Sequence, residues 1–359
     1  MAISFKRVSS RHQILKLQLM ALVPVTIAAL FNTGYQYLRV LANDPALESD
    51  DIRSRIASGL GASYQDPGVY DMLTAGLAHL LPILVVALIT GGIWERIIAE
   101  KRQRPFEPGF ILIALLFTLL LPGAAGFSHV VFGMSFAILF GKAIFGGEGK
   151  TFLSPALLGI AIVQVSYPGS AGQHPLWHGL TGYGGSEAIA LYHRGGEAAL
   201  AAADITPWSA FLGSTSGLMG TTSVLAVLLG AALLLVTRII SWRLLAAQII
   251  GLAVFVTLFN LSAAEPGAGM MPVHWHLLLG SFLFGAVFLA CDPVASCCTN
   301  PGRWIQGLLI GALVVLIRVV NSTHPDAVIP AMLLASILAP LIDHAVIAFN
   351  IRQRSRRHV

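Results

Sequence analysis

Long apolar segments follow one another along almost the whole chain, and they constrain its fold more than any other feature. Only 11% of the residues are charged, against about 25% in soluble domains. A helix that crosses a lipid bilayer needs about 20 mainly apolar residues, so we predict an all-α integral membrane protein with about ten transmembrane helices. Residues 1–359 would form a single polytopic membrane domain. The predicted spans lie near residues 14–36, 72–95, 109–122, 127–145, 152–167, 222–237, 244–262, 274–290, 304–320 and 327–348.

Basic residues orient these spans, because Lys and Arg collect in the cytoplasmic loops of membrane proteins. With ten spans, six basic clusters all fall on one side of the membrane. We therefore predict a multi-pass membrane protein with both termini in the cytoplasm. Two longer extramembrane loops, near 41–71 and 168–221, would lie on the opposite side. The clusters are Lys6, Arg7 and Arg11; Arg96, Lys101, Arg102 and Arg104; Lys150; Arg238 and Arg243; Arg303; and Arg352, Arg354, Arg356 and Arg357.

Metal and nucleic-acid binding are not predicted. Cys291, Cys297 and Cys298 form an odd, clustered set, which is neither a disulfide framework nor the spacing of a zinc site. His174 and His178 stand four residues apart, but no acidic or cysteine ligand supports them at a suitable spacing. The formal net charge of +5 is small for 359 residues and gives no nucleic-acid signal.

The segment 133–159 carries the strongest functional signal, because a polar, glycine-rich break separates two apolar runs there. Non-helical backbone at membrane depth survives only when it packs in protein or lines a cavity. Membrane proteins build sites for ions, cofactors or substrates at such breaks. We predict that Lys142, Gly146, Gly147 and Lys150 contribute to a cofactor-binding site.

A second polar break, 292–300, follows the apolar run 280–288, which faintly echoes the run 133–145. Both breaks fall on the predicted cytoplasmic side. They free backbone groups that can bind a ligand, so we predict that they approach each other and line a shared site. Asn300 and Trp304 are the predicted cofactor-binding residues of this second break.

Charged residues within or beside the apolar spans are costly in lipid and therefore mark functional or buried polar positions. Asp292, Arg318 and Asp343 are such residues, and we predict that they lie on an ion path. Arg318 lies deep enough to need a partner, which we expect to be an acidic side chain, a group of carbonyls or a cofactor oxygen.

Eight segments together resemble one family of membrane subunits: 140–157, 211–213, 241–243, 275–277, 292–294, 299–300, 317–321 and 339–344. This family includes the NqrB subunit of the sodium-translocating NADH:quinone oxidoreductase and the RnfD subunit of the Rnf complex. The similarity runs from about residue 10 to the C-terminus. It implies ten spans and electron transfer through membrane-embedded flavins toward quinone or between complex partners, coupled to Na⁺ or H⁺ movement.

The resemblance also implies a covalent flavin site, from which this chain departs. In the family, the threonine of a Ser-Gly-Ala-Thr segment carries FMN through a phosphoester bond. Aligned on Gly182 and Tyr183, this chain has Gly-Gly-Ser-Glu, so the acceptor position is Glu187. A carboxylate cannot form that ester, and its charge repels a phosphate. We predict no covalent FMN, with Thr221 and Thr222 as the fallback acceptors, because amides at a helix start can hold phosphate.

Two further departures leave two hypotheses for function. Ala143 stands where the family usually has an acid after the lysine of the break, and Thr221 replaces the acid of a Gly-Glu pair. The first hypothesis is a translocase subunit of the NADH:quinone or ferredoxin:NAD oxidoreductase type. It would work among partner subunits in the bilayer, with a noncovalent flavin (FMN or riboflavin) or as a quinone-binding, ion-path scaffold. The alternative is a transporter or structural subunit that reuses the fold without electron transfer.

Overall fold

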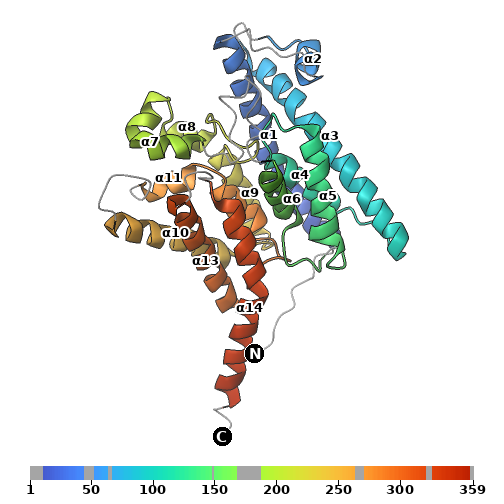
Figure 1. Cartoon of the computed structure of the whole chain (residues 1–359), viewed down its shortest axis with the longest axis vertical. Helices are drawn as coiled ribbons and strands as arrows, with labels where there is room; N and C mark the ends of the chain where they lie inside the picture. The colour runs from blue at the N-terminus through green and yellow to red at the C-terminus, as the bar shows by residue number, and fades with distance from the viewer. Residues whose placement is uncertain are drawn as a thin grey trace.

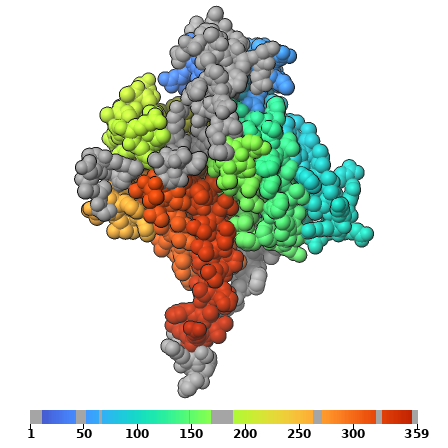
Figure 2. Space-filling model, in the orientation of Figure 1, coloured from blue at the N-terminus to red at the C-terminus, as the bar shows by residue number. Residues whose placement is uncertain are grey.

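A computed structural model describes residues 11–43, 52–63, 67–147, 149–167, 187–262, 271–320 and 326–355. Within these ranges every regular element is an α- or π-helix, which confirms the prediction of an all-α membrane protein. The helices pack side by side in one bundle (Figure 1). On the face shown in Figure 2, α14 (Val328–Ser355) lies beside the segment that contains α6 (Pro155–Ser166), and its last turns extend beyond the rest of the bundle.

The predicted spans correspond to helices of two length classes. Among the described residues, five helices are long and apolar enough to cross a membrane, and four of the predicted segments form shorter apolar helices. The long helices are α1 (Arg11–Asn43), α3 (Val69–Arg102), α10 (Trp242–Ser262), α13 (Asn300–Val320) and α14. The shorter ones are α4 (Phe110–Leu119), α5 (Phe127–Phe136) continued by the π-helix η2 (Ala137–Ala143), α6, and α9 (Val224–Val236).

The remaining predicted span, near 274–290, is broken into three pieces. It consists of α11 (Val273–Leu278), α12 (Phe282–Phe284) and the π-helix η6 (Gly285–Leu289). Gly280 interrupts it with a left-handed backbone, φ +79°, which glycine adopts without strain. Because the apolar run continues across Gly280, the sequence did not reveal this break.

The two runs that echo each other in sequence share one local architecture. Each ends in a π-helix, η2 in the first run and η6 in the second. Each is followed by a polar break and then by a helix with a proline near its start, Pro155 in α6 and Pro301 in α13. Since π-helical turns are rare and frequently occur at functional sites, their repetition makes both breaks candidate sites.

Both breaks lie on the side of the bundle where α14 ends, which we call the terminal side (Figure 1). The opposite, distal side carries the short helices α2 (Ile52–Gly59), α7 (Glu187–Ala202) and α8 (Pro207–Leu212). Small residues bring the spans into close contact. A Cβ atom on Gly34 of α1 would lie 1.7 Å from the carbonyl oxygen of Met72 in α3, so only glycine permits this approach of two backbones.

Candidate functional site

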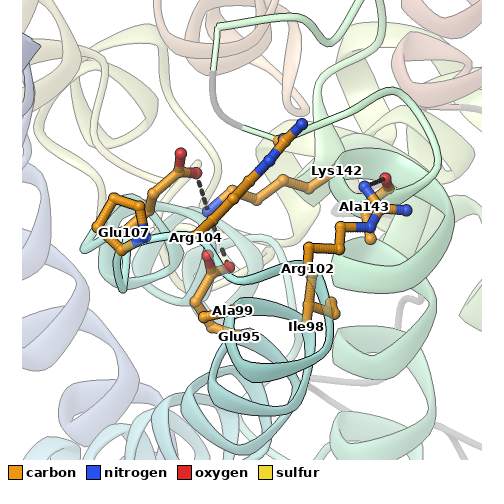
Figure 3. Close-up of a pocket in the computed structure, with 10 residues that line it drawn as sticks. Glu95, Ile98, Ala99, Arg102, Arg104, Glu107, Lys142 and Ala143 are labelled. Atoms are coloured by element: carbon orange, nitrogen blue, oxygen red, sulfur yellow. Dashed lines mark hydrogen bonds and ion pairs between the residues drawn. The ribbon is translucent and has the colours of Figure 1, made fainter.

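Lys142 forms the centre of a buried ion group on the terminal side (Figure 3). It lies in the last turn of η2, and its side chain is 4% exposed. Its Nζ atom lies 2.8 Å from Oε2 of Glu95, on α3, and 3.3 Å from Oε2 of Glu107, in the connection between α3 and α4. A buried ammonium is strongly destabilising without partners, so these two carboxylates explain how the lysine is tolerated in an apolar segment.

Two arginines hold the backbone that follows Lys142. Arg102 Nη1 donates a hydrogen bond of 2.7 Å to the carbonyl oxygen of Ala143, and Arg104 Nη1 donates to that of Gly146. Gly146 and Gly147 both have left-handed φ angles, +103° and +104°, which favour glycine. The predicted glycines therefore shape the turn, while the arginines satisfy the carbonyls released where the helix stops.

A cavity opens beside this ion group, between the end of α3 and the break. Glu95, Glu107, Lys142, Arg102 and Arg104 line it together with apolar atoms. The cavity has a volume of about 20 Å³, which is room for about one water or one bare inorganic cation. An isoalloxazine ring does not fit the cavity in this conformation.

Lys150, the fourth predicted residue of this break, is exposed. Its backbone N–H donates to the carbonyl oxygen of Gly147 at 3.4 Å. The structure thus brings Lys142 and Gly147 together at the cavity, with Gly146 in the adjoining turn, and leaves the Lys150 side chain at the surface.

In the second break, Asp343 receives hydrogen bonds at the start of α13. Its carboxylate accepts from the backbone N–H groups of Cys298, at 2.6 Å, and Thr299, at 3.1 Å, and from the Thr299 hydroxyl. A carboxylate there stabilises the exposed amides and the helix dipole. Asp292 accepts from the Val294 N–H at 3.1 Å and borders a small cavity. Their role on an ion path stays a prediction.

Asn300 and Trp304 belong to a surface group beside this break. The Asn300 side-chain oxygen accepts from Arg243 Nη1 at 3.3 Å. The Trp304 ring packs edge-on against Trp242, with ring centroids 6.2 Å apart. Each break is thus held by contacts of its own, and the shared site that would join them stays a prediction.

Arg318 has the buried partners that the sequence predicted. All five of its N–H groups have an acceptor: the carbonyl oxygens of His276, Leu279 and Asp326, the His276 ring, and the Asp326 carboxylate at 3.3 Å. Asp326 also accepts from the N–H and hydroxyl of Ser281. Arg318 therefore clamps the broken α11–α12 segment to the start of α14.

Little of the predicted flavin attachment segment can be described. Glu187 is the first residue of α7, whereas Gly182 and Tyr183 lie outside the described residues, as do His174 and His178. The fallback residues Thr221 and Thr222 are each 6% exposed, just before α9. A flavin on either hydroxyl would require this junction to unpack.

Sequence reasoning missed two residues that the structure makes prominent. Glu107, a partner of Lys142, lies in a short connection whose only signal is an acid between two prolines, Pro105 and Pro108. Arg53 lies in the polar stretch 41–71, where no apolar pattern marked it as buried, yet it is 4% exposed.

The described residues contain no group of three or more His, Cys, Asp or Glu side chains arranged to hold a metal. Burial raises the pKa values of the Cys291 and Cys297 thiols to about 12. Both thiols are therefore protonated at neutral pH, which makes them poor metal ligands and poor nucleophiles.

Comparison with known proteins gives consistent matches over almost the entire chain. The model of the NQR2, RnfD, RnfE family matches residues 5–352. The NqrB subunit of the Na(+)-translocating NADH-quinone reductase from Azotobacter vinelandii is 40% identical over 338 residues, covering 94% of this chain and 84% of the relative. The corresponding subunits from Stutzerimonas stutzeri and Pseudomonas aeruginosa are 40% and 38% identical, covering 94% and 93% of this chain and 84% of each relative.

Proposed function

The chain belongs to the NQR2, RnfD, RnfE family, and we propose that it is a membrane subunit of an ion-translocating electron-transfer complex of the Nqr or Rnf type. Its partners would be the other subunits, and quinone would be the electron acceptor. The relatives are NqrB subunits of a Na(+)-translocating NADH-quinone reductase. The observation that carries the proposal is the buried Lys142–Glu95–Glu107 group beside a water-sized cavity, because charges inside a membrane domain mark ion and substrate paths.

We further propose that this subunit carries no covalent FMN. The acceptor position of the family is Glu187, which begins α7. A carboxylate has no hydroxyl group with which to form the phosphoester, and its negative charge opposes a phosphate. The residue at the acceptor position therefore does not fit the covalent group.

A noncovalent flavin, FMN or riboflavin, remains part of the proposal only if the terminal-side cavity opens. The cavity beside Lys142 admits about one water in the present conformation. A flavin there would require the connection between η2 and α6 to move away from α3. Quinone binding at this site carries the same requirement.

We propose that the terminal side faces the cytoplasm of a bacterial inner membrane. Basic side chains gather on that side at the ends of several helices, as the rule for cytoplasmic loops requires. They include Arg96, Lys101, Arg102, Arg104, Lys150, Arg238, Arg243, Arg303 and Arg352. A C-terminal reporter that is active only in the periplasm would contradict this orientation.

Purification of the tagged chain from its native membrane tests the proposed function. Co-purification of further subunits, with NADH- or ferredoxin-dependent electron transfer, supports it. Visible absorbance before and after acid precipitation then separates the cofactor states: a noncovalent flavin leaves the protein, whereas a covalent one remains. A homogeneous protein without partner subunits, without flavin and without electron transfer would favour the alternative, a transporter or structural subunit.

A further inference from the structure

The distal side contains a second buried arginine, which the proposed function does not use. Arg53 lies on α2, a helix of eight residues whose outer residues, such as Arg55 and Ile56, are exposed. Arg53 itself is 4% exposed and reaches down into the membrane domain. Its Nη1 atom donates to the carbonyl oxygen of Gly123 at 2.8 Å, and its Nη2 atom donates to that of Ala125.

These two carbonyls and the ring of Phe127 form what we call the distal cradle. The Arg53 guanidinium carbon lies 4.9 Å from the centre of the Phe127 ring. The carbonyls belong to the buried, non-helical connection between α4 and α5. Backbone carbonyls replace the hydration shell of monovalent cations in channels, and an aromatic face attracts cations. The cradle is therefore chemically suited to a positive charge, of which the guanidinium is one example.

Arg318 fills a comparable position in the second half of the chain, but it is fixed there. It bonds the carbonyls of His276 and Leu279, and the Asp326 carboxylate neutralises its charge. It belongs to α13, a spanning helix of 21 residues. Arg53 instead belongs to a short distal helix. A helix of this length has little stability of its own, so it can move without unfolding a membrane span.

Polar groups continue from the cradle region into the bundle along α1. The Tyr37 hydroxyl contacts the Ser54 hydroxyl of α2 at 3.2 Å. The neighbouring Gln36 and, one helical turn further on, Asn32 are buried, and the Gln36 amide group donates to the Asn32 side-chain oxygen at 3.5 Å. The Gln36 and Asn32 amide groups also donate to the carbonyl oxygens of Ser214, at 2.7 Å, and Thr215, at 3.0 Å, in the connection between α8 and α9.

We propose that the distal cradle binds a monovalent inorganic cation and that α2 is its lid. With the lid closed, the Arg53 guanidinium takes the place of the cation. With the lid raised, the carbonyls of Gly123 and Ala125 are free to coordinate the cation, and water completes its shell. The role of this site rests on the proposed function, since a complex that moves ions needs a cation site open to the far side of the membrane.

The first test removes the guanidinium from the full-length protein in lipid nanodiscs. We expect Arg53→Ala to melt at a lower temperature than the unmodified protein in choline chloride. Sodium or potassium chloride at the same ionic strength should restore its melting temperature in a saturable manner. The unmodified protein and the matched variant Arg55→Ala, changed on the exposed face of α2, should depend on sodium much less, because their Arg53 guanidinium competes with the cation for the cradle.

A second test leaves Arg53 in place and therefore does not depend on the folding of that variant. Ser54, which is 6% exposed, is changed to Cys in a background in which the exposed Cys298 is changed to Ser. A membrane-impermeant maleimide then reports lid opening, and we expect its labelling rate to rise severalfold when sodium replaces choline.

Two results would overturn the proposal. One is an Arg53→Ala protein that is restored by guanidinium alone and by neither sodium nor potassium, because the cradle would then be only a seat for the arginine. The other is a Ser54→Cys labelling rate that is the same in choline and in sodium. Neither readout uses electron transfer, so failure here is distinguishable from failure of the proposed function.

Discussion

Replacing Arg318 by methionine should destabilise the protein far more than replacing an exposed basic side chain does. The Arg318 side chain is fully buried, and Asp326 is 7% exposed at its side chain. Methionine has similar length and apolar character but no N–H group. The change therefore removes the hydrogen bonds and the charge while it preserves most of the packing.

The magnitude follows from what the substitution leaves behind. Asp326 becomes a buried carboxylate without its cation, and breaking one partner of a buried ion pair costs about 3–5 kcal/mol. The carbonyls of His276 and Leu279 also lose their guanidinium donors, and a buried acceptor without a partner costs about 1–3 kcal/mol. These terms are not additive, so we expect a loss of at least about 3 kcal/mol.

The assay is unfolding of the purified protein in mixed micelles by titration with a denaturing detergent. Arg96→Met is the control, because Arg96 pairs with Glu100 at 3.0 Å on an exposed helix surface, where such pairs contribute about 0.3–0.5 kcal/mol. The double variant Arg318→Met/Asp326→Asn should recover part of the loss. A cost for Arg318→Met no larger than that of Arg96→Met would refute the clamp.

Three further predictions concern the other polar groups. Lys142→Met should destabilise the protein by about 3–5 kcal/mol in the same unfolding assay, since it leaves Glu95 unpaired, and adding Glu95→Gln should recover part of that loss. On a denaturing gel under ultraviolet light, neither the native protein nor the variant Glu187→Thr should show flavin fluorescence. Changing residues 184–187 together to Ser-Gly-Ala-Thr should restore an attachment segment. A fluorescent native band would contradict the prediction. Burial lowers the pKa of His193 on α7, so the unfolded chain binds more protons than the folded protein. The melting temperature should therefore fall as the pH is lowered from about 7.5 to about 5.5. The variant His193→Gln should show a smaller fall, and a variant with the same pH profile as the native protein would contradict this prediction.

The all-α membrane class and the order of the apolar segments could be predicted from sequence because lipid imposes a length and a composition on each span. Helix ends were less predictable. The α4 helix stops at Leu119, before Pro122 and Gly123, although the apolar run continues to residue 121. The break within 274–290 was missed for the same reason, since the backbone turn at Gly280 does not interrupt the hydrophobic pattern.

Of the buried ion group, only Lys142 could be predicted from the sequence. The glycine-rich break identified Lys142, and membrane energetics required that a lysine there have a partner. The partners come from other elements: Glu95 lies 47 positions earlier, and Glu107 lies in a loop with no periodic pattern. Contacts between distant elements depend on helix packing, which apolar periodicity alone does not specify.

The echo between two apolar runs is a weak signal in the sequence, yet the two runs share one arrangement in the structure. In both halves a buried arginine binds carbonyls that precede a π-helix: Arg53 at Gly123 and Ala125, and Arg318 at His276 and Leu279. The halves differ in what carries the arginine. One arginine lies on a spanning helix, and the other lies on a short helix outside the bundle. Both arginines bind backbone carbonyls, but the short helix α2 has less stability of its own than the spanning helix α13. We therefore expect movement in the first half of the chain. The same half contains the Lys142 ion group on the terminal side. The helices α1, α3 and α5 would therefore connect a cation bound at the distal cradle to the charges around Lys142.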